Sequence, residues 1–293
     1  MDLFLSQLLN GIGNGVVYAS LALALVLIFR TTGFLNFAQG EMALFSTYVT
    51  WQLTDWGLPV VASILISMAL AFIMGVVIER VVIRPVEGGS PLVAVIVTLG
   101  LFLAFNSISQ LIFGTESKVL PSAFPDSSWD VGGIRITAQT VGLMVVLAAE
   151  CLLLYWLLQR TKLGLAFRAV SSNAESSKLV GISVGSMLAL GWGLSAALGA
   201  LAGAMVVPTT PALTAASLQA VLVYSFAGAA LGGFDSPLGA VVGGITIGVA
   251  QALTIQYIDP LNDIELVVPF ALIGLVLLFR PSGLFGRHVV ERV

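Results

Sequence analysis

The sequence has few charged side chains. Only 9% of its 293 residues are Asp, Glu, Lys or Arg, against about 25% in an ordinary soluble domain, and 58% are hydrophobic. This balance predicts a membrane protein and argues against a water-soluble fold. The net charge of −3 leaves no basic excess to hold a polyanion, so nucleic acid is not expected among its partners.

Cysteine and histidine are almost missing, with Cys151 and His288 the single examples of each. One cysteine cannot form an internal disulfide. Because the only histidine lies in the tail, a Cys/His metal site and an internal Cys-His or Ser-His dyad also lose support. None of the three lysines follows a glycine, so the G-x-x-x-x-G-K-[ST] phosphate loop is absent as well. We therefore expect no metal, no cofactor and no catalytic residue, and we predict that the chain is not an enzyme.

Long stretches without charge predict helices that cross a bilayer, because about 20 mostly apolar residues span its hydrocarbon core. The charge-free stretches are Leu3 to Phe29, Trp56 to Ile78, Gly88 to Thr115, Ser236 to Ile258, and Leu179 to Phe234, which is long enough for two spans. Weaker candidates are Gly33 to Thr54, Ala138 to Gln159 and Leu266 to Phe279. The predicted fold is all-α: a polytopic transmembrane helical bundle of about eight to nine membrane segments, forming a single domain over residues 1–293.

Basic residues set the orientation, because cytoplasmic loops retain Lys and Arg. If Arg30 ends the first span inside and each segment crosses, ten of the twelve basic residues lie in inner loops and only Lys118 and Arg135 lie outside. The acidic residues Asp126 and Asp263 fall in outer loops. The predicted topology places the N-terminus outside and the C-terminus inside. If residues 33–54 re-enter rather than cross, the N-terminus lies inside instead.

Glycine is abundant, and many of its 31 copies recur at four-residue spacing. The pairs are Gly11 with Gly15, Gly199 with Gly203, Gly228 with Gly232, Gly239 with Gly243, and Gly244 with Gly248. Small residues at this spacing let helices approach closely in lipid, so we predict that most of these glycines serve helix packing.

The inner connection over residues 160–185 is predicted to form two short helices. Asn173 suits an N-cap, Glu175 favours the positive end of the helix that follows, and Gly181 suits the left-handed position after its end. The second helix is thus expected over Ala174 to Val180. This connection is either an ordinary basic loop or a rigid protrusion that docks into a partner.

Several motifs together resemble one family, the permease subunits of ABC importers for branched-chain amino acids, of the LivH type. The similar segments are Gly15 to Leu23, Gly33 to Met42, Leu163 to Gly181, Leu231 to Gly244, and Arg280 to Gly286. They occur in the order typical of the family and extend over nearly the whole chain.

The resemblance implies a membrane-spanning permease that forms the pathway for branched-chain or other hydrophobic amino acids. Its implied partners are a second related permease subunit, two cytoplasmic ATPase subunits that bind the ATP, a periplasmic substrate-binding protein, and membrane lipid. The implied location is the bacterial cell inner membrane, with several passes. The connection over residues 160–185 would be the coupling loop, with Gly164, Arg168, Ala169, Asn173, Glu175 and Gly181 as its candidate coupling residues.

Candidate pathway residues lie near the start of the second hydrophobic segment: Asn36, Gln39, Gly40 and Glu41. Asn36 and Gln39 supply amide donors and acceptors, and an ionisable residue inside a membrane segment is a functional candidate by default. On a helical wheel Asn36 and Gln39 lie about 60° apart, whereas Glu41 lies roughly 160° from Gln39. Glu41 thus either serves the pathway or makes a structural polar contact, and a structural contact is the favoured interpretation for Glu150.

Other functions stay open at this point. The same family pattern serves urea and short amides. An ion-coupled secondary transporter commonly carries paired ionisable groups near the membrane midplane, and the spans here hold few beyond Glu41 and Glu150. An intramembrane enzyme ranks last, since the chain has neither an H-E-x-x-H motif nor a second histidine.

Overall fold

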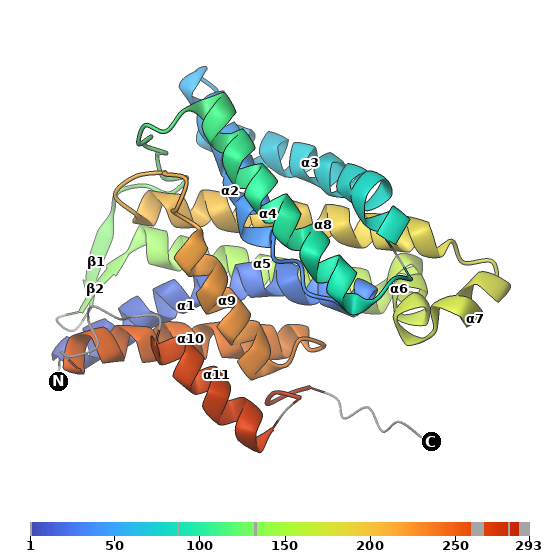
Figure 1. Cartoon of the computed structure of the whole chain (residues 1–293). Coiled ribbons are helices and arrows are strands. Elements are labelled where there is room, and N and C mark those ends of the chain that lie inside the picture. Colours follow the sequence, from blue (N-terminus) through green and yellow to red (C-terminus); the bar gives the residue numbers. More distant parts are fainter. Residues whose placement is uncertain (1, 87, 132–133, 259–266, 281, 287–293) are drawn as a thin grey trace. The chain divides into compact units, whose positions relative to one another are not determined.

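The chain folds almost entirely into helices, as the sequence predicts. The computed structural model describes residues 2–86, 88–131, 134–258, 267–280 and 282–286. The helices and strands, in chain order (Figure 1), are α1 (Asp2–Thr32), α2 (Gln39–Asp55), α3 (Val60–Ile78), η1 (Glu79–Ile83), η2 (Arg84–Val86), α4 (Pro91–Phe113), β1 (Ser128–Val131), β2 (Ile134–Thr137), α5 (Ala138–Arg160), α6 (Lys162–Ser172), α7 (Ala174–Leu179), α8 (Val184–Val206), η3 (Val207–Thr209), α9 (Gln219–Gly232), α10 (Pro237–Tyr257) and α11 (Val267–Phe279).

Six of the described helices are long and apolar enough to cross a membrane: α1, α3, α4, α5, α8 and α10. Helices α2, α9 and α11 are shorter, with 17, 14 and 13 residues. The polytopic helical fold is confirmed, while the expected count of eight to nine segments holds only approximately. The predicted long run of residues 179–234 does hold two helices, α8 and α9.

Some residues used in the topology argument lie outside the described part of the chain. Among them are Asp263, which the topology argument assigned to an outer loop, and the basic residues Arg287 and Arg292 near the C-terminus.

The chain divides into two compact units. One comprises Met1–Val26, Phe124–Val145 and Ala220–Val293, and the other comprises Leu27–Ala123 and Val146–Gln219. We call them the α10 unit and the α8 unit, after the long helix that each contains.

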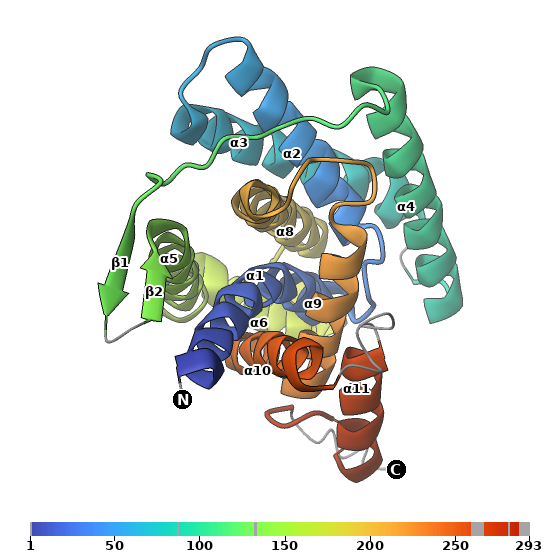
Figure 2. The ribbon, with the colours of Figure 1, turned by 90° about the vertical axis from the view of Figure 1, so that its left-hand side faces the viewer.

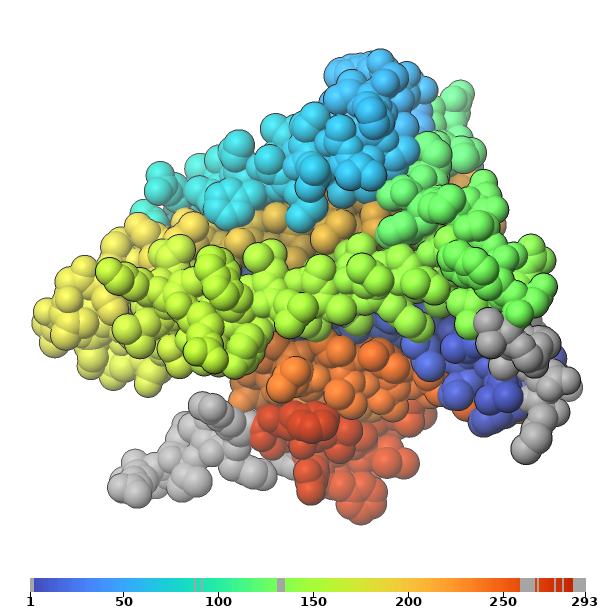
Figure 3. Space-filling model, turned by 180° about the vertical axis from the view of Figure 1, so that it is seen from behind, coloured from blue at the N-terminus to red at the C-terminus, as the bar shows by residue number. Residues whose placement is uncertain are grey.

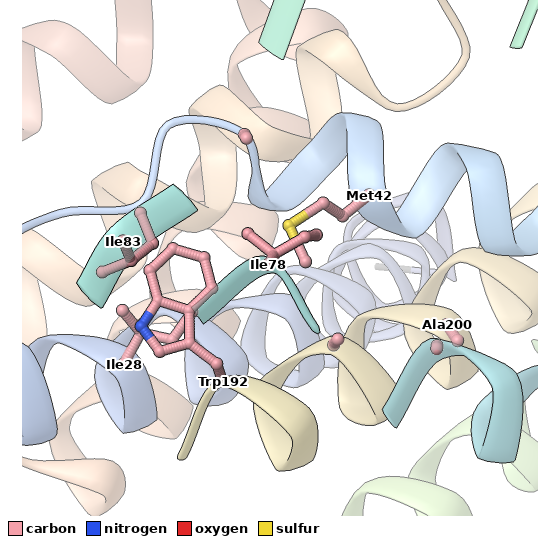
Figure 4. Packing of buried hydrophobic residues seen from close by; sticks show 9 residues of the cluster. Ile28, Met42, Ile78, Ile83, Trp192 and Ala200 are labelled. Carbon is pink, nitrogen blue, oxygen red and sulfur yellow. The ribbon is translucent and has the colours of Figure 1, made fainter. Parts of the chain in front are cut away.

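In the α8 unit, α8 packs against α3 and α2, and Figure 2, which looks nearly along α8, shows both beside it. Glycine makes the approach possible: a Cβ at Gly75 would collide with the carbonyl oxygen of Trp192, and one at Gly193 would lie 2.9 Å from the ring of Phe72. The fully buried Trp192 then packs against Ile28, Met42 and Ile78 (Figure 4). Its Nε1 has no hydrogen-bond partner within the described residues.

In the α10 unit, glycines lie where α10 packs against α1 and α9. A Cβ at Gly15 would lie 2.6 Å from the Cα of Ile245, and one at Gly244 would lie 2.5 Å from the backbone nitrogen of Ala19. Gly228 on α9 approaches Gly244 on α10 in the same way. These glycines therefore let backbones pack directly, as predicted from their four-residue spacing.

Two features were not expected from the sequence. The connection after α4 contains an antiparallel hairpin, β1 with β2, in a chain predicted to be all-α. The C-terminal end of α3 continues into the π-helical turn η1, and there Arg84 Nε lies 3.4 Å from the buried Glu79 Oε1. A hydrophobicity pattern does not reveal either feature, because both depend on local hydrogen bonding.

Candidate functional site

The first candidate residues lie where the helical structure is interrupted, between the end of α1 and the start of α2. Gly33 has a φ of +77°, a left-handed conformation that ends α1 and that residues with a side chain rarely adopt. Asn36 follows in the connecting segment, where its Oδ1 accepts a hydrogen bond of 3.0 Å from the backbone N–H of Ala38. Helix α2 then begins at Gln39. The helical wheel used for Asn36 was therefore wrong, because Asn36 precedes the helix.

Gln39 connects α2 to α8. Its Nε2 donates to the carbonyl oxygen of Ser195 at 3.0 Å, and its Oε1 accepts from Ser195 Oγ at 3.1 Å and from Asn36 Nδ2 at 3.2 Å. Gln39 and Asn36 are 0% and 1% exposed. Gly199 allows this approach, since a Cβ there would lie 2.5 Å from Gln39 Nε2. The two amides are thus engaged with protein groups and hold α2 against α8.

Glu41 points away from this cluster, as its wheel angle from Gln39 suggests. Its Oε2 accepts from Asn106 Nδ2 of α4 at 3.0 Å, and its Oε1 accepts from Gln219 Nε2 at 3.4 Å. Asn106 also donates to the carbonyl oxygen of Ala215 at 3.1 Å and accepts from Gln110 Nε2 at 2.7 Å. We call Glu41, Asn106, Gln110 and Gln219 the Glu41 network. The first turn of α2 therefore presents two separate polar groups on two faces.

Two further residues were singled out from the sequence, Gly40 and Glu150. Gly40 is buried in the first turn of α2, between Gln39 and Glu41. Glu150 lies in α5 and is 3% exposed, so it is buried to the same degree as Glu41 at 2%. The structure does not bring Glu150 into the Glu41 network.

The predicted coupling loop forms two short helices, α6 and α7. Thr161 caps α6 by accepting a hydrogen bond from Gly164 N, and Asn173 caps α7 by accepting one from Ser176 N at 2.8 Å. Gly181 has a φ of +83° after the end of α7. The second helix ends at Leu179, one residue earlier than predicted.

The other candidate coupling residues sit along these helices. A Cβ at Gly164 would collide with the carbonyl oxygens of Leu157 and Leu158, so the corner between α5 and α6 requires glycine. Arg168 Nη1 donates to Gln159 Oε1 at 3.2 Å, and the carbonyl oxygen of Ala169 accepts from Asn173 N. Glu175 is exposed on α7. These contacts give the loop a defined shape.

The tip of this loop carries a feature that sequence reasoning missed. Leu179 and Val180 are 88% and 76% exposed, so two adjacent aliphatic side chains project from the loop. In Figure 3 the yellow side chains of this region lie farther to the left than the cyan ones of α3. A signal was available in the sequence, since an aliphatic pair directly follows a polar helix with no helical periodicity to bury it.

The loop contacts the rest of the α8 unit at several points, among them an apolar cluster of Val170 with Val184 and Leu188. Ser171 Oγ donates to the carbonyl oxygen of Arg30 at 2.6 Å, next to the end of α1. Gly185, in the first turn of α8, packs against the guanidinium of Arg84, where a Cβ would collide with Nη2. Helix α8 therefore begins directly beyond the loop and carries Ser195, the partner of Gln39, on a later turn.

One sequence motif in this region is explained by the structure. Gly181 to Gly185 matches the G-x-S-x-G pattern of nucleophile elbows, but such an elbow needs a strand before the serine. Ser183 instead follows helix α7 and is the N-cap residue of α8. In this protein the G-x-S-x-G pattern therefore marks the start of helix α8.

Comparison with known proteins agrees with this architecture. The profile of the family described as "branched-chain amino acid transport system / permease component" matches residues 7–277. Six described helices that are long and apolar enough to cross a membrane fit a transport permease. The protein belongs to this family of membrane permeases.

Individual relatives cover the full length. LivH of Escherichia coli K12, a high-affinity branched-chain amino acid transport system permease protein, is 31% identical over 99% of this chain and 98% of its own. BraD of Pseudomonas aeruginosa, of the same description, is 30% identical over 99% and 98%. The galactofuranose transporter permease YtfT of Escherichia coli K12 is 28% identical over 64% of this chain and 52% of its own.

Proposed function

We propose that the chain is the permease subunit of an ABC importer for branched-chain or other hydrophobic amino acids. The observation that carries the proposal is the similarity to LivH and BraD over 99% of the chain, two proteins whose names specify this substrate class. The chain acts as a single permease domain and performs no covalent chemistry itself. A bacterial inner membrane is the location that fits such an importer.

The energy for transport comes from other chains in this proposal. The sequence has no phosphate loop, so this chain does not bind ATP by that route. In the proposal, two cytoplasmic ATPase subunits bind it. A second related permease completes the pathway, and a periplasmic binding protein delivers the amino acid. Transport then alternates between two states of the pathway, and ATP binding in the partner chains biases that equilibrium.

The coupling loop over residues 160–185 is the proposed docking site for an ATPase subunit. Two capped helices give it rigidity, and the exposed Leu179 and Val180 offer apolar side chains to the core of such a contact. Because α8 follows directly, a displacement of the loop moves α8 and, through Ser195, the start of α2. Gln39 and Asn36 in this proposal keep the start of α2 attached to α8, so that the two move together when the pathway changes state.

Copurification tests the proposed assembly. The tagged permease is coexpressed with the ATPase, second permease and binding protein encoded with it, and extracted in mild detergent. The proposal predicts a complex of two permease and two ATPase subunits whose ATPase activity rises with the loaded binding protein. A permease that purifies alone and retains transport in proteoliposomes would contradict it.

A further inference from the structure

We propose that Glu41 binds the ammonium group of the amino acid as it passes through the pathway. The proposal rests on the proposed function and adds to it a charged contact with the substrate. Urea and short amides, the alternative substrates that the sequence left open, have no ammonium group, so this contact would favour a zwitterionic amino acid over them.

The contacts of Glu41 are the first observation. Both carboxylate oxygens accept hydrogen bonds from carboxamide N–H groups, an arrangement that is compatible with an ionised carboxylate. Within the part of the chain that the structure describes, no Lys or Arg forms an ion pair with it. A buried carboxylate with only neutral partners is costly, and a cation that enters the site relieves this cost.

The second observation is that the network opens at the surface of the α8 unit. Glu41 is 2% exposed, but Asn106 and Gln110 are only half-buried and Gln219 is exposed. Asn106 and Gln110 belong to α4, one of the candidate membrane spans, where polar side chains face a protein partner or a water-filled cavity and avoid lipid. A solute on this side of α4 reaches the carboxylate through a small rearrangement of two amides.

The third observation is the apolar surface beside the carboxylate. Phe45 lies one helical turn after Glu41 on the same face of α2, and its ring is 5.6 Å from that of Phe105 and 5.8 Å from that of Phe113. All three rings are half-buried. A carboxylate next to aromatic rings matches an ammonium group attached to a hydrophobic side chain.

The free acceptor positions of the Glu41 carboxylate also match the donors of an ammonium group. A carboxylate offers about four lone-pair positions, and the two amides occupy two of them. An ammonium has three donors, so it can bind Glu41 while the oxygens of Asn106 and Gln219 accept its other protons. The Gln39 cluster offers no comparable site, because its amides are buried and engaged with Ser195 and with each other.

The test compares Glu41→Gln with wild type in the complete complex, reconstituted in proteoliposomes with its binding protein and labelled leucine. The variant keeps the size of the side chain and removes its charge. We expect leucine uptake to fall by about tenfold or more, as for loss of a charge-assisted contact. ATPase activity stimulated by the binding protein should stay within about twofold, so more ATP is hydrolysed for each leucine moved.

The matched control is Glu150→Gln, which removes a carboxylate of equal burial from α5. Its uptake should stay near that of wild type. Uptake in Glu41→Gln equal to wild type would overturn the proposal, and so would a parallel loss of uptake and ATPase activity in that variant, since a purely structural contact predicts such a loss.

If Glu41→Gln fails to assemble, the double variant Glu41→Gln with Gln219→Glu moves the carboxylate to the other side of the same hydrogen bond. Recovery of most of the uptake supports the proposal, and an assembled double variant without uptake overturns it. Absence of ATP-dependent leucine uptake in wild type would instead contradict the proposed function, so the two failures are distinguishable.

Discussion

The side chain of Gln39 makes two hydrogen bonds to Ser195, one to its carbonyl oxygen at 3.0 Å and one from its hydroxyl at 3.1 Å. These bonds join the first turn of α2 to the middle of α8, over 156 residues of sequence. Helix α8 begins just after the predicted coupling loop. Under the proposed function, the pair is one contact through which movement of that loop would reach α2.

Removing the hydroxyl of this pair should slow transport. In Ser195→Ala, Gln39 Oε1 loses one donor, and we expect a loss of stability of about 1 kcal/mol together with slower uptake. Ser225→Ala is the control, because its equally buried hydroxyl bonds only to Val221 O of its own helix. Melting temperature and uptake rate are measured for both, and identical uptake in the two variants would contradict a role for the pair in coupling.

Changes at Asn36 or Gln39 should not alter which amino acid is preferred. Both residues are buried and bonded to protein groups, so Asn36→Ala and Gln39→Ala remove packing and hydrogen bonds but no selective contact. We expect slower uptake of leucine-like amino acids with unchanged ranking in a competition assay. Exchange of the binding protein should change the ranking instead. A changed ranking in the alanine variants would make these residues a selectivity site.

The apolar tip of the coupling loop should be needed for the ATPase contact. Leu179→Ser leaves α7 and its Asn173 cap in place but removes the most exposed aliphatic side chain of the tip. We expect less ATPase subunit to copurify with this variant. Val119→Ser, at a site 74% exposed in the predicted outer connection, is the control and should retain the full amount. Equal copurification from the two variants would exclude Leu179 from the contact.

Orientation is tested by labelling single cysteines in intact cells, in a Cys151→Ser background. A cysteine at Asp126, in the connection before β1, should react with an impermeant thiol reagent from outside, whereas one at Lys178 in α7 should not. Permeabilised cells provide the control, since Lys178→Cys should then react. Labelling of Lys178→Cys in intact cells would reverse the predicted topology.

Glycine packing yields a stability prediction with opposite signs at two helical sites. A Cβ at Gly248 would collide with the backbone of Gly15, so Gly248→Ala should lower stability by about 1–3 kcal/mol. Gly100 on α4 has no atom within 4 Å of an added Cβ, so Gly100→Ala should be neutral or raise stability by up to about 1 kcal/mol. Thermal melting of the detergent-solubilised protein distinguishes the two. Equal melting temperatures would show that the α1–α10 contact tolerates a methyl group.

Much of the fold could be predicted from the sequence, because membrane helices depend on composition and length. The charge-free stretches located α1, α3, α4 and α10, and capping chemistry located α7 to within one residue. The wheel placement of Asn36 failed because a left-handed Gly33 and an Asn side chain bonded to Ala38 N keep the chain non-helical until Gln39. Local backbone bonding of this kind leaves no hydrophobic pattern.

The candidate site could be predicted only in part. Asn36, Gln39 and Glu41 stood out as polar residues in an apolar segment, but their partners come from distant helices. Ser195 is one serine in a long apolar run, and Asn106 and Gln110 lie in a helix otherwise recognised by its hydrophobicity. Which polar residues meet depends on the tertiary packing of α2 against α4 and α8, and a single sequence does not encode this in any local pattern.

The source of energy is the central claim, and it is tested most directly by uptake into proteoliposomes that contain the purified complex. Labelled leucine and the binding protein are added outside, with ATP enclosed at the ATPase side and no ion gradient. We predict uptake that requires ATP and stops when the nucleotide site of the ATPase subunits is disabled by mutation. Uptake that persists in that mutant and follows an imposed proton or sodium gradient would contradict the account.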